Sequence, residues 1–174
     1  GIRDSSVTGV QTCALPISAI ACRTIPLAVS TAQAKLNTDG SLDVLTSSVE
    51  MGQGLLTAMA ILAAEAISLP IDAVRVSTPD TAVTPYDQQT SASRTTGAMG
   101  HCVLEAVGEI RRQLLDLAGG LLEIARDDLR LEDGRVFPKD APDRGLTYGD
   151  VVRKSRRSEE HTSELQSHLN LVCR

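Results

Sequence analysis

Residues 54–67 read GLLTAMAILAAEAI, a stretch in which only Thr57 and Glu65 are polar. A helix that is apolar nearly all round is stable only when other parts of the fold cover it. Pro70 follows shortly afterwards, and proline cannot continue a helix. This stretch therefore predicts a buried helix and requires layers of structure packed around it.

Strands are predicted on both sides of this helix. Residues 30–37 and 41–48 alternate between apolar and polar side chains, and the Asp39-Gly40 pair between them favours a tight turn. A further short strand is centred on Val74–Val76. A hairpin, a helix and a strand in this order predict a sheet with a helix packed across it.

The second half of the chain predicts a long amphipathic helix. Residues 83–100 are rich in Pro, Gly, Ser and Thr and read as a loop. Apolar residues then recur at helical spacing, with charged residues on the opposite side. The apolar positions are Val103, Val107, Ile110, Leu114, Leu117 and Leu121. Gly119-Gly120 is expected to mark a break in this helix or its end.

A second hairpin is predicted around Asp133-Gly134, and a short helix with Thr147 as its N-cap. The predicted fold class is therefore α+β: a β-hairpin and short strands packed with a buried helix and a long amphipathic helix. We expect this to be part of a larger domain, because small apolar residues suit the interior of a large assembly.

Composition excludes several functional classes. The chain has 17 Lys and Arg against 22 Asp and Glu, a formal net charge of −5, which argues against nucleic-acid binding. Its 4 cysteines and 3 histidines show no metal-binding or redox spacing, so no protein-ligated metal is predicted. No stretch has the ~20 apolar residues of a membrane span. Unpaired cysteines mildly favour a cytoplasmic location over a periplasmic one.

The two ends read unlike the middle and lack any apolar period. Residues 7–17 and 158–167 can be encoded by the two strands of a single DNA sequence, as can residues 1–6 and 168–173. Both ends resemble translated sequencing-adapter DNA, typical of a metagenomic read. We therefore expect residues 1–17 and 157–174 to be non-native tails, and residues 18–156 to be a partial domain.

The sequence Met51-Gly52-Gln53-Gly54 places two glycines at the start of the first helix. The first backbone N–H groups of a helix lack internal partners, and this end of the helix dipole is positive. Glycine would let an anionic ligand approach these groups, and the Gln53 amide could read the edge of a heterocycle. The alternative is a plain strand-to-helix turn.

A second polar loop, residues 88–96, leads into the long helix. It offers several hydroxyl groups and the fixed cation of Arg94. The alternative is that Ser93, Thr95 or Thr96 simply caps the helix while Arg94 is solvated. Two such loops, each following a β segment and opening a helix, are expected to meet at one edge of a sheet, where ligands bind.

Several short motifs recur here in a specific order. They are a DG hairpin, EMGQG, a helix containing AAE, the segment PIDAVRV, DT followed by PYD, and SRTT with a glycine after it. In this combination residues 34–107 resemble the molybdopterin-binding large subunit of the molybdenum hydroxylases, the xanthine dehydrogenase and aldehyde oxidase family. The resemblance identifies the chain as an internal fragment of such a subunit.

The resemblance implies a site for the pyranopterin cofactor. Met51, Gly52, Gln53 and Gly54 match one cofactor-contacting segment, and Ala92, Ser93 and Arg94 match a second. In this family the molybdenum is held by the cofactor and not by protein side chains. Iron–sulfur clusters and FAD are expected on other domains or subunits, which would be partners of this chain together with the rest of its own subunit.

The implied activity is hydroxylation of an aldehyde, purine or N-heterocycle carbon, with water as the source of oxygen. The glycine-rich motif that carries the family's catalytic glutamate is not found here, and neither Glu50 nor Glu65 is predicted to be catalytic. The chain alone is therefore expected to be inactive. The alternative function is a non-catalytic anion- or cofactor-binding α+β module used in assembly.

Overall fold

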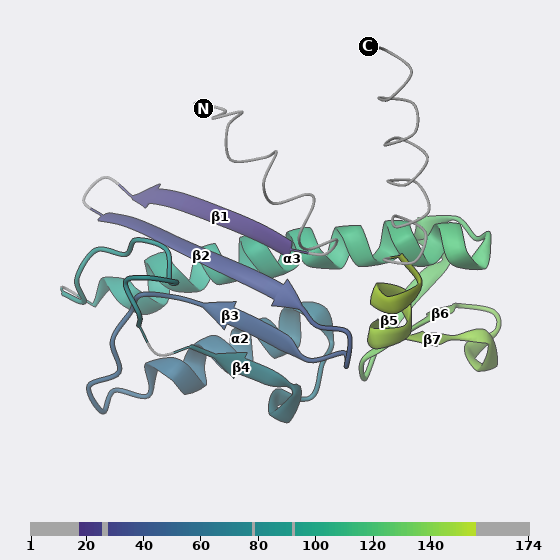
Figure 1. The fold of residues 1–174 in the computed structure, drawn as a ribbon, viewed down its shortest axis with the longest axis horizontal. Coiled ribbons are helices and arrows are strands. Elements are labelled where there is room, and N and C mark those ends of the chain that lie inside the picture. The colour runs from purple at the N-terminus through teal and green to yellow at the C-terminus, as the bar shows by residue number, and fades with distance from the viewer. Residues whose placement is uncertain (1–17, 26–27, 78, 92, 156–174) are drawn as a thin grey trace, which may run out of the picture.

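The computed structural model describes residues 18–25, 28–77, 79–91 and 93–155, with side chains from residue 30 onward. The predicted tails lie outside the described residues. Two sheets, one of four strands and one of three, lie along a single long helix (Figure 1). The architecture is α+β, as the sequence predicts.

The larger sheet contains both segments of the predicted first hairpin. Its strands are β1 (Ser18–Ile25), β2 (Ala28–Leu36), β3 (Leu42–Leu45) and β4 (Val74–Val76), in the order β1-β2-β3-β4. β1 pairs antiparallel with β2, and β2 with β3. β3 and β4 are parallel. Strand β1 has no counterpart in the sequence predictions.

Helix α2 (Leu55–Ile67) connects the two parallel strands. Its buried side includes Met59 and Ala63, both fully buried. The opposite side is exposed, with Thr57, Ile61 and Glu65 spaced one turn apart. Among the described residues the predicted buried helix is therefore buried along one side and exposed along the other. The helix packs through one side only, and the apolar Ile61 on the other side is 53% exposed.

Helix α3 (Arg94–Leu122) is the predicted long amphipathic helix and packs against both β1–β2 and α2. Figure 1 shows it running behind the larger sheet and on toward the smaller one. It continues through Gly119-Gly120 and ends two residues later, at Leu122, with Glu123 as its C-cap. Four side chains at helical spacing lie fully buried on its inner face: Val103, Val107, Ile110 and Leu114.

The core lies between the helices and one face of the larger sheet. Alternate residues of β2 and β3 point into it, as a two-residue strand period requires. These residues are Ala32, Ala34, Leu36, Leu42 and Val44, none more than 3% exposed. The small alanines on β2 leave room for α3 to pack closely against the strand.

The smaller sheet contains the predicted second hairpin. Its strands are β5 (Leu129–Glu132), β6 (Arg135–Pro138) and β7 (Leu146–Thr147). Asp133 and Gly134, between β5 and β6, have φ angles of 46° and 72°, as a type I′ turn requires. Short 3-10 turns cover 71–73, 126–128 and 142–144.

The chain then forms the predicted short helix over residues 148–155. The hydroxyl of Thr147 accepts a hydrogen bond from the Asp150 N–H at 3.1 Å, which confirms Thr147 as its cap. The Tyr148 hydroxyl donates to the carbonyl of Ile67 at the end of α2, at 2.7 Å. Gly149 lies against the β2–β3 turn, where a Cβ would come within 2.6 Å of the Thr38 carbonyl oxygen. These contacts join the short C-terminal helix, which directly follows β7, to the end of α2 and to the β2–β3 turn.

Candidate functional site

The two predicted cofactor loops lie at the same edge of the larger sheet. Parallel strands end at a common edge, so the segments that follow β3 and β4 leave the sheet together. Residues 46–54 lead from β3 into α2, and residues 77–93 lead from β4 into α3. Figure 1 shows both helices beginning at this edge, on the left of the view.

Hydroxyl groups join the two loops directly. The Oγ of Ser47 lies 2.7 Å from the Oγ1 of Thr84 and donates to the Pro85 carbonyl. The neighbouring Ser48 hydroxyl donates to the carboxylate of Asp87. β3 ends at Leu45, so Ser47 and Ser48, which the sequence predicts as strand residues, lie in the first loop and connect it to the second.

Asp87 is the hub of a buried polar network. Its carboxylate accepts hydrogen bonds from the Ser30 hydroxyl on β2 at 2.7 Å and from the Ser48 hydroxyl after β3. It also forms an ion pair with Arg94 at 3.3 Å, in which the two side chains are 2% and 10% exposed. Asp87 thus ties together a strand, both loops and the first residue of α3.

The Arg94 guanidinium is directed into the protein. Beyond its pairing with Asp87, it donates to the carbonyl oxygens of Gln88 and Gln89, the latter at 3.0 Å, and to the Ser30 hydroxyl. The alternative in which Arg94 is solvated is therefore wrong. The guanidinium N–H groups that could bind a phosphate are instead used to stabilise the conformation of the loop before α3.

The start of α2 is already occupied by a side chain of this chain. The carboxylate of Glu50 accepts hydrogen bonds from the N–H groups of Gly52 at 2.8 Å, Gly54 at 3.0 Å and Leu56 at 3.1 Å. These bonds, with that of Leu56 foremost, lower the pKa of Glu50 below its ordinary value of 4.5. These N–H groups are consequently not open to a ligand in this structure.

The Gln53 amide closes the same turn. Its Oε1 accepts from the Met51 N–H at 2.6 Å, and its Nε2 donates to the Val49 carbonyl at 2.9 Å. Met51 is 66% exposed, so the outer surface of the turn remains accessible. Gly52 and Gly54 have φ angles of 98° and 76°, and glycine is needed here for its backbone conformation.

The start of α3 differs from that of α2. Its N-cap residue is Ser93, and no side chain forms a capping hydrogen bond there. Ser93 itself adopts φ 56°, and the following Thr96 and Gly97 are exposed. A Cβ on Gly97 would meet no described atom within 4 Å apart from its chain neighbours and the adjoining backbone of its own helix. The predicted contact Ala92 lies outside the described residues.

Among the described residues, no cluster of three or more His, Cys, Asp or Glu side chains is arranged to hold a metal ion. None of the described helices combines the length and the apolar character needed to cross a membrane. Cys102 is buried, and its thiol donates to the Ser30 carbonyl at 3.2 Å, beneath the Asp87 network.

Comparison with known proteins decides the family. The model of the molybdopterin cofactor-binding domain matches residues 6–170. The chain belongs to this family. The large subunit of nicotine 6-hydroxylase from Paenarthrobacter nicotinovorans is 30% identical over 122 residues, covering 70% of this chain and 15% of that protein. The molybdenum-binding subunit of xanthine dehydrogenase from Escherichia coli O157:H7 is 32% identical over 126 residues, covering 71% and 17%.

Solved structures share the fold. Quinoline 2-oxidoreductase from Pseudomonas putida 86 superposes with a TM-score of 0.68 and 24% sequence identity, covering 89% of this chain and 22% of that one. CO dehydrogenase from Oligotropha carboxidovorans gives a TM-score of 0.63 at 20% identity, covering 86% of this chain and 21% of that one. The chain therefore spans less than a quarter of the length of these relatives.

The residues at this edge fit part of a molybdopterin site. The start of α3 offers an uncapped helix end beside exposed Gly97, which suits a phosphate. The exposed Met51–Gly54 turn offers a surface for an uncharged part of the cofactor, since Glu50 already fills the N–H groups of that helix. The roles of the individual residues stay predictions.

Sequence reasoning missed what two residues do at this edge. The resemblance implies a structural Glu50 but not its bonds to the N–H groups at the start of α2, and Asp87 was given no role. An acidic residue just before a helix start is a recognisable signal for Glu50. The Asp87–Arg94 pair also has a signal, since opposite charges seven residues apart flank a loop.

Proposed function

We propose that this chain is the part of a molybdenum hydroxylase large subunit that grips the pyranopterin cofactor at the edge formed by residues 46–54 and 77–93. The complete enzyme would hydroxylate an aldehyde, purine or N-heterocycle carbon with water as the oxygen source. The observation that supports this most is the meeting of two helix starts at one sheet edge, joined by the Ser47–Thr84 contact at 2.7 Å.

Each predicted contact has a distinct task in this proposal. Ser93 and the open first turn of α3 bind the negatively charged phosphate through backbone N–H groups. Met51, Gly52, Gln53 and Gly54 present the outer surface of their turn to the ring system, and Ala92 completes the second contact segment. Arg94 acts as a positioning residue, because its donors are committed to Asp87 and to loop carbonyls.

When bound, the cofactor would supply the redox and oxygen-transfer chemistry, while this chain binds, orients and shields it. Electrons would leave through iron–sulfur clusters and FAD on partner domains or subunits. The rest of the large subunit would supply the catalytic base. A cytoplasmic location is proposed in preference to a periplasmic one.

The test is cofactor content, which needs no turnover. The chain would be purified from a host that makes molybdopterin, and bound pterin measured by its fluorescence after oxidation. Gly97→Asp places a carboxylate in the first turn of α3, where it favours the helix but repels a phosphate. We expect bound pterin to fall about tenfold, corresponding to about 1.4 kcal/mol.

Gly97→Asn is the matched control, because it has the same shape without the charge, and it should retain most of the pterin. Gln53→Ala and Thr57→Ala form a second pair, one in the predicted contact turn and one on the exposed side of α2. Pterin content that is equal in the Asp and Asn variants, or absent from the unaltered chain, would contradict the proposal.

One observation favours the alternative of a non-catalytic module. The Glu50 carboxylate already occupies the anion-binding groups at the start of α2, so this helix end needs no ligand to be satisfied. A chain that folds fully, carries no pterin and still associates with a cofactor-bearing subunit would support an assembly role.

A further inference from the structure

A cavity of about 370 Å³ lies far along α3 from the predicted cofactor edge, between the last turns of that helix and the smaller sheet. Its lining residues are Arg111, Leu115, Leu129, Arg130, Leu131 and Lys139. This volume lies at the lower end of the range of small-molecule sites, and the cavity is open to solvent on one side. The cavity takes no part in the proposed cofactor binding.

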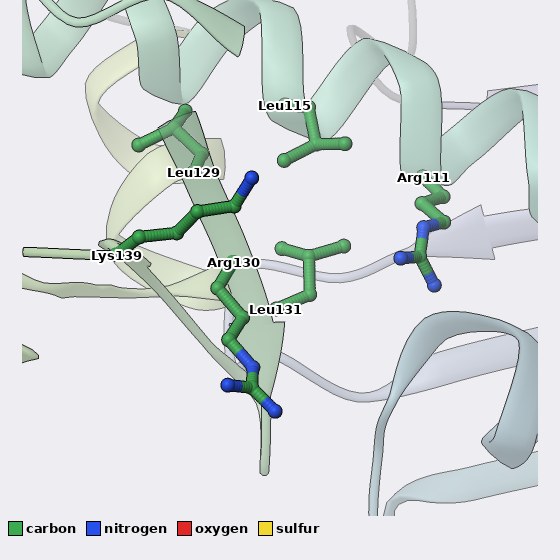
Figure 2. A pocket seen from close by; sticks show the side chains of 6 residues that line it. All are labelled: Arg111, Leu115, Leu129, Arg130, Leu131 and Lys139. Carbon is green, nitrogen blue, oxygen red and sulfur yellow. The ribbon is translucent and has the colours of Figure 1, made fainter. Parts of the chain in front are cut away.

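The lining combines an apolar floor with positive charge. Leu129 and Leu131 project from the same side of β5 and are only 6% and 7% exposed, while the half-buried Leu115 faces them from α3. Figure 2 shows the Lys139 amine between Leu115 and Leu129, and Arg111 on the side of Leu131. No acidic residue belongs to this described lining.

The cations at the rim have spare donors. Lys139 gives one hydrogen bond to the Asp127 carbonyl at 2.5 Å, and an ammonium group has three protons to donate. Arg111 gives one to the Ala66 carbonyl at 3.0 Å, out of the five N–H donors of a guanidinium. Arg130 points away from the leucines and lies 3.8 Å from Glu132, so it contributes less.

We propose that this cavity binds a small amphipathic carboxylate, with its alkyl chain on the three leucines and its carboxylate on Lys139, while Arg111 on the far side of Leu131 adds positive charge to the rim. Apolar surface alone would accept any hydrocarbon, whereas the Lys139 ammonium selects a ligand with a negative end. A charge-assisted hydrogen bond to a carboxylate in a partly dry site is stronger than one between neutral groups. The proposal does not depend on molybdopterin binding at the other end of α3.

Octanoate is the probe, and 1-octanol of the same chain length is the neutral comparison. We expect octanoate to bind the purified chain at least tenfold more tightly than octanol by calorimetric titration. The methyl signals of Leu115, Leu129 and Leu131 should shift in NMR spectra as octanoate is added. Lys139→Met keeps the length of the side chain, removes its charge and should weaken octanoate binding about tenfold while leaving octanol binding unchanged.

Lys154→Met is the matched control, because Lys154 is exposed on the helix over 148–155, outside the cavity lining. Leu115→Asp provides a second variant, which should abolish octanoate binding by placing a carboxylate in the cavity. Thermal unfolding would confirm that each variant is folded. Equal affinity for octanoate and octanol, shifts confined to other methyl groups, or octanoate affinity that Lys139→Met leaves unchanged would overturn the proposal.

Discussion

The Asp87 carboxylate and the Arg94 guanidinium form a 3.3 Å ion pair that is almost completely removed from solvent. The pair closes the loop that precedes α3, and the serine contacts of Asp87 extend it to β2 and to the loop after β3. The shape of the sheet edge at which the two loops meet therefore depends on one buried carboxylate.

Replacing Asp87 with Asn should destabilise the chain by about 3 kcal/mol, because it leaves the Arg94 charge buried without its counter-ion. The measurement is urea unfolding at pH 7, together with hydrogen exchange across residues 46–54 and 77–93. Asp116→Asn is the control, since its pair with Arg126 has side chains 57% and 46% exposed and should contribute less than about 0.5 kcal/mol. Similar losses in both variants would refute the structural role of Asp87.

Gly54→Ala should destabilise the chain by roughly 1 kcal/mol, because Gly54 has φ 76° and an alanine is strained in that conformation. Gly108→Ala should instead stabilise it by up to about 1 kcal/mol, since Gly108 is exposed inside α3 with open space around it. Thermal or urea unfolding of the two variants measures both effects. Opposite signs are expected, and a loss in both would contradict the assigned helix start.

The contribution of Glu50 should depend on pH. Its folded-state pKa lies below its ordinary value of 4.5, so its stabilising effect is complete above that value and is lost as the pH falls through the folded-state pKa. Glu50→Gln should therefore be less stable than the unaltered chain at pH 7, and the difference should shrink in strongly acidic solution. Urea unfolding at several pH values tests this, and a pH-independent difference would argue against the carboxylate cap.

Gly149→Ala should destabilise the chain by about 1–3 kcal/mol, because the added methyl group would press on the Thr38 carbonyl oxygen from 2.6 Å away. The expected damage is a loosened contact between the short C-terminal helix and the β2–β3 turn. Gly120→Ala, on an open part of α3, is the control and should not be destabilising. Unfolding midpoints that fall equally in both variants would show that this contact is not tight.

Local signals in the sequence predict much of the fold. The Asp39-Gly40 and Asp133-Gly134 pairs predict both hairpins, because few residues other than glycine adopt the backbone conformation that such turns need. The spacing of Val103, Val107 and Ile110 predicts the inner face of α3. Thr147 predicts a helix start because its hydroxyl can accept a hydrogen bond from a backbone N–H in the first turn, which is also a local interaction.

Long-range contacts account for what was missed. β1 pairs with β2 along its whole length, but the sequence of a strand does not reveal which other strand it pairs with. The exposed side of α2 carries both polar residues of the helix, Thr57 and Glu65, but Ile61 lies between them, so two polar residues alone are a weak signal of which surface is covered. At the candidate site, the sequence alone does not show that Arg94 has buried partners. Its contact with Ser30 on β2 and its ion pair with Asp87 form only in the folded chain.

The unbroken course of α3 has a mechanical consequence. Its 29 residues make a rod about 44 Å long, with Arg94 at one end and Leu115 near the other. Turning such a rod by about 5° around its midpoint displaces each tip by roughly 2 Å. Because α3 is continuous, any rigid-body shift of its C-terminal turns would also displace its first turn, so the two ends of this helix cannot be repositioned independently without bending it.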